Sequence, residues 1–102
     1  MKETVAVAEP LPGSSPSRPD GLHVLAIDLG SGGPKAAVVS DSGVVRASAF
    51  EKAELHLLPR GGAEQDPHEW WACVKRAVKK AIGDSGVPPE TIAAVSCDSQ
   101  YF

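Results

Sequence analysis

The sequence predicts an α/β protein with a small mixed sheet and one main helix. Four short apolar runs are bounded by turns rich in glycine or proline, which is typical of strands. One longer segment has helical periodicity and a complete start signal, and it separates the third run from the fourth. Three strands joined directly and a fourth reached through a helix indicate a mixed sheet, because a right-handed crossover returns the chain parallel to the first strand.

The predicted strands differ in their patterns. Residues 22–27 are almost continuously apolar and are expected to be buried on both faces, whereas residues 44–50 alternate and indicate a more exposed strand. The other two strands are predicted at 35–40 and 91–96. The short apolar patch 55–58 is interpreted as a strand extension, and a loop follows it.

The start of the helix is the sharpest boundary in the chain. Asp66 is a capping residue, Pro67 takes the first helical position, and Glu69 stands three places after the cap. These residues are expected to satisfy the free N–H groups of the first turn. The helix is expected to end at Gly83 or Gly86, before a Pro-Pro pair that prevents its continuation.

Two faces of this helix are predicted. The apolar stripe consists of Trp70, Val74, Ala77, Val78 and Ala81. The basic residues, interpreted as a solvated face, are Lys75, Arg76, Lys79 and Lys80. Trp71 lies next to the stripe, and we expect it in the core or in packing against another domain rather than in a sugar platform.

Length and composition limit the class of protein. With 102 residues, the chain has room for one small domain at 21–102, after a proline- and serine-rich segment at 1–20 that is expected to be a disordered leader. A net charge of -3 argues against a nucleic-acid surface. No membrane span and no signal peptide are predicted, so the cytoplasm is the expected location. Cys73 and Cys97 are interpreted as small buried hydrophobes.

The stretch LHVLAIDLGSGGPK carries the main chemical signal. The carboxylate of Asp28 could hold Mg²⁺, and the glycines Gly30, Gly32 and Gly33 would permit positive φ and a close approach of a ligand. With Ser31 and Lys35, this turn would bind a phosphate. The spacing excludes a Walker loop and a dinucleotide fingerprint. A glycine hairpin turn in which Asp28 caps its own backbone is the structural alternative.

Two blocks, DLGSGGPK and AEQDPHEWW at 63–71, resemble the N-terminal domain of the FGGY family of carbohydrate kinases, most closely its xylulokinase-like branch. The resemblance covers Val24 to about Gln100. It implies an incomplete ribonuclease-H-like domain of the actin, heat-shock ATPase and sugar kinase superfamily, with ATP and Mg²⁺ as cofactors. The loop residues named above would face the ATP phosphates, with Asp28 holding the metal, and Ser99, Gln100 and Tyr101 would lie at the sugar or polyol side.

The sequence departs from that family in several places. Family loops usually carry Thr or Ser where Gly32 and Gly33 stand, and Pro34 removes another N–H. Xylulokinases typically have Gly-Gln-Met-His where this chain has Ser-Gln-Tyr-Phe, which places xylulose itself in doubt and leaves Tyr101 to contact another polyol.

Family members are several times longer, so the chain is expected to be the N-terminal portion of a kinase. The catalytic base would lie beyond residue 102, and the chain alone is expected to be inactive. A homodimer of the full-length protein is left open. The alternative is a non-catalytic remnant or binding module with the same half-domain fold.

Other candidates have structural explanations. Glu64 and Asp66 form an acid pair, but the helix cap accounts for Asp66. The three histidines show no ligand spacing and are interpreted as structural or solvated. Asp98 follows the fourth strand, where it would line the substrate site or stabilise a local turn.

Overall fold

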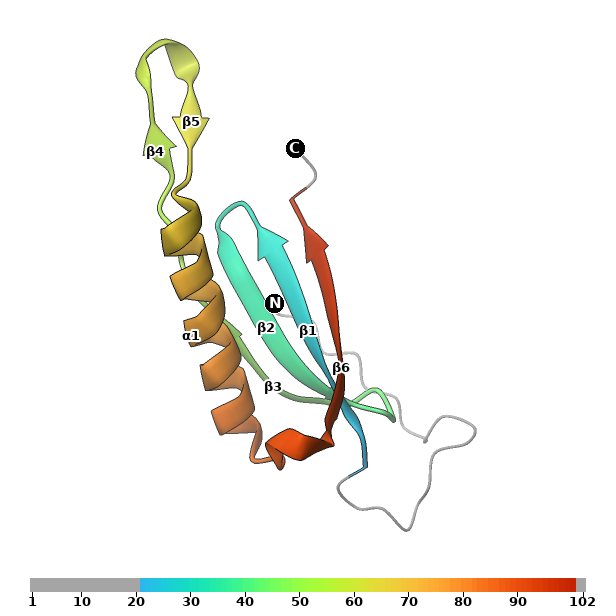
Figure 1. Cartoon of the computed structure of the whole chain (residues 1–102). Helices are drawn as coiled ribbons and strands as arrows, with labels where there is room; N and C mark the ends of the chain where they lie inside the picture. Colours follow the sequence, from blue (N-terminus) through green and yellow to red (C-terminus); the bar gives the residue numbers. More distant parts are fainter. Residues whose placement is uncertain (1–20, 101–102) are drawn as a thin grey trace.

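The computed structural model describes residues 21–100, and the predicted leader 1–20 and Tyr101 lie outside the described residues. A four-stranded mixed sheet has one long helix along one face, and a narrow two-stranded arm extends beyond the N-terminal end of the helix (Figure 1). The strands are β1 His23–Gly30, β2 Gly33–Ser40, β3 Val45–Phe50, β4 His56–Leu57, β5 Ala63–Glu64 and β6 Ile92–Ser99. The helix is α1 Pro67–Ser85, and short 3₁₀ turns occur at Pro59–Gly61 and Pro89–Thr91.

The sheet has the predicted mixed topology. Its strand order is β3-β2-β1-β6, in which β1 pairs antiparallel with β2 and parallel with β6. The strands β1 and β6 extend further than predicted. In particular, β1 continues through Asp28 to Gly30, because Gly30 pairs directly with Gly33 and leaves only Ser31 and Gly32 in the turn. The predicted glycine loop is therefore a two-residue hairpin turn.

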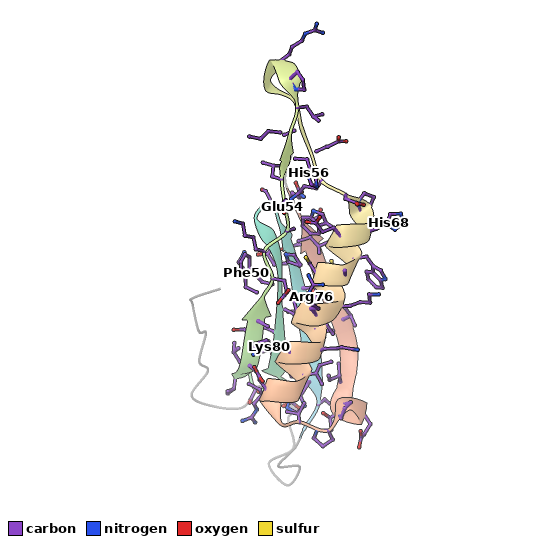
Figure 2. The ribbon with its side chains drawn as sticks, turned by 90° about the vertical axis from the view of Figure 1, so that its left-hand side faces the viewer. Phe50, Glu54, His56, His68, Arg76 and Lys80 are labelled. Carbon is purple, nitrogen blue, oxygen red and sulfur yellow. The ribbon has the colours of Figure 1, made fainter. Side chains whose placement is uncertain are left out.

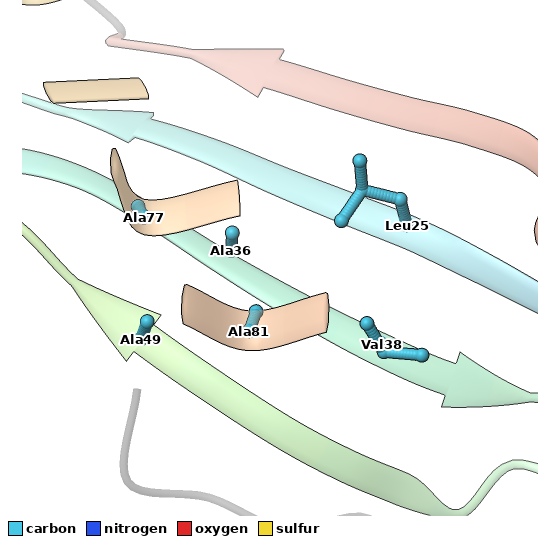
Figure 3. Packing of buried hydrophobic residues seen from close by; sticks show 6 residues of the cluster. All are labelled: Leu25, Ala36, Val38, Ala49, Ala77 and Ala81. Atoms are coloured by element: carbon cyan, nitrogen blue, oxygen red, sulfur yellow. The ribbon is translucent and has the colours of Figure 1, made fainter. Parts of the chain in front are cut away.

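The core between sheet and helix is built mainly from small side chains. Its buried residues are Leu25, Ala36, Val38, Ala49, Ala77 and Ala81 (Figure 3). Ala77 and Ala81 are one turn apart on α1 and are both fully buried, which allows the helix backbone to lie close to β2 and β3. The close packing fixes the distance of α1 from the central strands.

The predicted helix cap is confirmed in part. The Asp66 carboxylate accepts a hydrogen bond from the His68 amide at 2.9 Å, and Gly86 ends the helix with φ of 70°. Glu69 has a different role from the predicted one, since its Oε1 accepts the backbone N–H of Glu54 at 2.7 Å. Glu69 therefore ties the segment after β3 to the helix.

Two burial predictions are wrong, for one reason. Most of β1 is only half-buried, and Cys97 is exposed. Within residues 21–100, α1 is the single helix on the sheet, so the opposite face and the β6 edge have no covering layer. Cys73 is buried as predicted, and Trp70 is half-buried. Trp71 has 61% of its surface exposed, so it lies outside the core, and its packing against another domain stays a prediction.

The structural interpretation of His23 is confirmed. This side chain is 1% exposed, and its Nδ1 lies 2.9 Å from the hydroxyl oxygen of Thr91. Because the Thr91 hydroxyl donates to the Pro88 carbonyl at 2.7 Å, the imidazole is the donor in the first contact. His23 thus fixes the start of β1 to the start of β6.

The hairpin turn rests on the segment that follows β3. The Glu51 amide donates to the Pro34 carbonyl at 3.0 Å, and the Ala53 amide donates to the Gly32 carbonyl at 3.1 Å. Gly33 has φ of 138°, and a Cβ atom there would overlap the Glu51 carbonyl oxygen and lie 2.8 Å from the Ala53 nitrogen. Glycine is thus required at 33 by both conformation and space.

We predict that Gly33→Ala destabilises the chain, because backbone atoms that cannot move aside occupy the position of the new methyl group. The free energy of unfolding should fall by about 2 to 4 kcal/mol. Gly32→Ala is the matched control, since nothing lies within 4 Å of its Cβ position. Urea denaturation of both variants tests this, and equal midpoints for the two would contradict it.

Candidate functional site

The predicted site residues gather at one end of the sheet. The β1–β2 turn, the end of β6 and the start of α1 lie at this end (Figure 1). The turn residues Ser31 and Gly32 are exposed, as are Ser99 and Gln100 at the end of β6. The structure thus brings the predicted phosphate side and the predicted sugar side to the same end of the sheet.

The sheet register places three charged residues side by side. Asp28 on β1 is opposite Lys35 on β2 and opposite Asp98 on β6. The Lys35 Nζ atom lies 3.5 Å from Asp28 Oδ2, and it lies 5.5 Å from the centre of the Phe50 ring, which is the partner of Lys35 on β3. Neighbours of these residues along the strands, such as Ala36, belong to the core under α1. The charged row therefore lies on the sheet face that α1 does not cover.

The two carboxyl groups of the row affect each other. The hydrogen bond from Asp98 to Asp28 raises the pKa of Asp98 above its ordinary value, and partial desolvation and repulsion by the Asp28 charge act in the same direction. The Leu29 backbone amide and the charge of Lys35 oppose this rise. A negative charge at Asp28 thus favours a proton on Asp98.

The donor set fits a Mg²⁺ ion that is shared with a phosphate. Within residues 21–100, no group of three or more His, Cys, Asp or Glu side chains could hold a metal. Asp28 and Asp98 supply two hard carboxylates beside an open pocket of about 350 Å³ that Lys35 also lines. Mg²⁺ typically uses one or two carboxylates and completes its shell with water and substrate phosphates. The residues present suit such a site and do not suit a closed metal cage.

The turn differs in detail from the expected cradle. Of the three glycines predicted to permit positive φ, only Gly33 has it, and its role is to rest on the Glu51–Ala53 segment. Gly30 and Gly32 have negative φ or extended backbone and sufficient space for a Cβ atom. That expectation is wrong for these two, because the turn reverses direction through Ser31 and Gly32 without a left-handed residue. Gly32 is exposed with nothing within 4 Å of its Cβ position, whereas Gly30 is half-buried.

The turn and the end of β6 are joined by Gln65, to which the sequence assigned no role. Gln65 Nε2 donates to the Ser31 carbonyl at 3.0 Å, and its Oε1 accepts from Gln100 Nε2 at 3.2 Å. Gln65, Gln100 and Trp71 are among the residues that line an open pocket of about 500 Å³. From the sequence, Gln65 could have been noticed only by its position directly before the helix cap Asp66. Its residue type alone did not indicate a site.

Comparison with known proteins decides the family. The model of the FGGY family of carbohydrate kinases, N-terminal domain, matches residues 23–101, which include the β1–β2 turn, the charged row and Gln65. The chain belongs to the FGGY family of carbohydrate kinases.

Individual relatives cover the same region. An FGGY relative, the glycerol kinase of Roseobacter denitrificans, is 36% identical over 78 residues, which are 76% of this chain and 16% of the relative. A xylulose kinase of Staphylococcus epidermidis is 32% identical over 77 residues, again 76% of this chain and 16% of the relative. The chain thus spans about a sixth of the length of the curated relatives it matches.

A solved structure supports the fold assignment. A crystal structure described as a xyloylose kinase from Brucella ovis superimposes with a TM-score of 0.57 at 24% identity, over 60% of this chain and 13% of that chain. The mixed sheet with one helix therefore corresponds to part of an FGGY N-terminal domain, as predicted.

The Asp28–Asp98 contact predicts a pH dependence of stability. The folded chain holds the Asp98 proton more tightly than the unfolded chain does, so stability should fall as the pH rises from the ordinary carboxyl range through the raised pKa of Asp98. Asp98→Asn imitates the protonated acid, so it should remove this fall and be more stable than the parent chain at neutral pH. Urea midpoints between about pH 3 and 7 test this, and parallel profiles would contradict it.

Proposed function

We propose that this chain forms the N-terminal part of an ATP-dependent kinase that transfers the γ-phosphoryl group to a sugar or polyol hydroxyl. The observation that carries the proposal is the row of Lys35, Asp28 and Asp98 beside the exposed turn. A cation and two carboxylates next to open backbone suit a metal-bound polyphosphate, since phosphoryl transfer needs positioning and charge neutralisation above all.

The turn and each residue of the charged row have distinct tasks in this proposal. Gly30, Ser31, Gly32 and Gly33 present backbone and a hydroxyl group to the phosphates of ATP. Lys35 leaves Asp28 and contacts a phosphate oxygen when the nucleotide binds, because both partners of that ion pair are partly exposed. Asp28 is the Mg²⁺ ligand, and Asp98 lies close enough to support it. The ion, when bound, neutralises charge on the phosphates.

The acceptor is assigned to the end of β6. Ser99 and Gln100 would contact the hydroxyl groups of the substrate, together with Tyr101, which lies outside the described residues. The sequence resembles the xylulokinase-like branch, and the relatives include glycerol kinases as well as xylulose kinases. We therefore propose a pentulose or a related polyol as the acceptor.

The proposal also covers the whole protein. The chain would be the first part of a longer kinase, with the catalytic base and the adenine site in the remainder, and would not turn over substrate by itself. We propose a cytoplasmic enzyme that acts on small molecules. No helix within residues 21–100 is long and apolar enough to cross a membrane.

We predict that Asp28→Ala in the full-length kinase lowers kcat by at least about 10² to 10³-fold, because the metal loses its protein ligand. The unfolding transition should remain cooperative. A coupled ATPase assay with the acceptor sugar measures the loss. Asp84→Asn is the matched control, since it removes a carboxylate from an exposed ion pair with Lys80 on α1. Full activity of Asp28→Ala would refute the metal role.

We also predict that one acceptor stabilises the full-length kinase in the presence of MgATP. A thermal-shift panel of pentuloses, hexuloses and polyols, glycerol included, tests this. A ligand at a hundred times its Kd should add about 2.7 kcal/mol to the free energy of unfolding. A panel in which neither MgATP nor any acceptor raises Tm would contradict the proposed function.

A further inference from the structure

The geometry points to Gln65 as a positioning residue that holds the phosphate turn and ties it to the substrate end of β6. Resting on the proposed function, the inference assigns a task to a side chain that touches neither the metal site nor the reacting groups. It is carried by two hydrogen bonds of one carboxamide. The Gln65 side chain donates to the Ser31 carbonyl and accepts from the Gln100 side-chain amide.

The orientation of this carboxamide follows from its partners. A backbone carbonyl can only accept, so the NH₂ group of Gln65 must face Ser31. The Gln65 oxygen then faces Gln100, which acts as the donor. A glutamine can complete both contacts because its amide group donates and accepts at once, whereas a carboxylate can only accept.

The backbone that carries Gln65 is itself fixed. It directly precedes Asp66, whose carboxylate caps the helix, and Pro67, which begins it. The helix is in turn packed on β2 and β3 through fully buried alanines. The side chain of Gln65 therefore extends from a rigid base toward the turn.

Two consecutive carbonyl groups of the turn each accept a hydrogen bond from a different part of the chain. The Ser31 carbonyl accepts from Gln65 in front of α1, and the Gly32 carbonyl accepts from Ala53 after β3. The turn makes no left-handed bend of its own at Ser31 or Gly32. Without Gln65 the Ser31 carbonyl would lose this support, so the backbone of the exposed residues Ser31 and Gly32 would be less preorganised for a phosphate.

The test uses ¹⁵N relaxation of the 102-residue chain and three variants. In Gln65→Ala, the order parameters of Ser31 and Gly32 should fall from about 0.85 toward 0.6, while those of α1 stay unchanged. Gln65→Glu keeps an acceptor for Gln100 but cannot donate to Ser31, so it should loosen the turn equally. Glu64→Gln is the matched control on the neighbouring residue and should leave the turn unchanged.

A binding measurement extends the test to the ligand. The Kd of the chain for MgATP, followed by the same amide signals, should rise about three- to tenfold in Gln65→Ala, as expected for one lost hydrogen bond. Gln100→Ala should have a smaller effect, and the double variant should match Gln65→Ala alone.

The outcomes separate the two proposals. Unchanged order parameters at the turn in both Gln65 variants would overturn the positioning role, whatever the nucleotide does. A loosened turn, together with a full-length kinase that does not bind MgATP at all, would support the positioning role and contradict the proposed function. If the α1 signals are lost in Gln65→Ala, this variant has unfolded, and the order parameters of Gln65→Glu then decide the positioning role.

Discussion

The close contact between the β1–β2 turn and the segment after β3 is the constraint on which the site depends. Gly33 lies against Glu51 and Ala53 with no room for a side chain. That segment is held in place by α1, because Cys73 Sγ contacts the Lys52 carbonyl at 3.5 Å and Arg76 pairs with Glu51 at 2.8 Å. Figure 2 shows Glu54 and Arg76 in this region, where the chain after β3 passes beside the helix. The helix thus positions the turn through an intermediate segment.

The second determinant of the site is strand register. Because Asp28 is paired with Lys35 on one side and with Asp98 on the other, the three charged residues lie in a single row across β2, β1 and β6. A shift of one residue in either pairing would move one charge to the opposite face of the sheet. The His23–Thr91 contact holds the other end of β1 against the start of β6 and so supports the parallel register. The chemistry at one end of the sheet therefore depends on packing at the other.

The sequence was sufficient for the order and type of the main elements, since strand patterns and the Asp66–Pro67 start signal are local properties. It also singled out Asp28 and Lys35, which the structure places opposite each other on β1 and β2. It could not show that Asp98 shares their row, because register between β1 and β6 is set across a crossover. The role of Gln65 depends on two contacts with residues more than 30 positions away. Burial was predicted too high for β1 and Cys97, because local pattern does not reveal whether a second layer covers the sheet.

The proposed kinase function requires that the β1–β2 turn binds the phosphates of a metal–nucleotide complex. The most direct measurement is a ¹⁵N NMR titration of the chain with MnATP, in which the paramagnetic ion replaces Mg²⁺, compared with the same titration using MgATP. We expect the amide signals of residues 28–33 and of Lys35, together with that of Asp98, to broaden first. Signals of the β4–β5 arm and of the C-terminal half of α1 should be spared. Broadening that begins elsewhere, or none at the turn at saturating nucleotide, would contradict the claim.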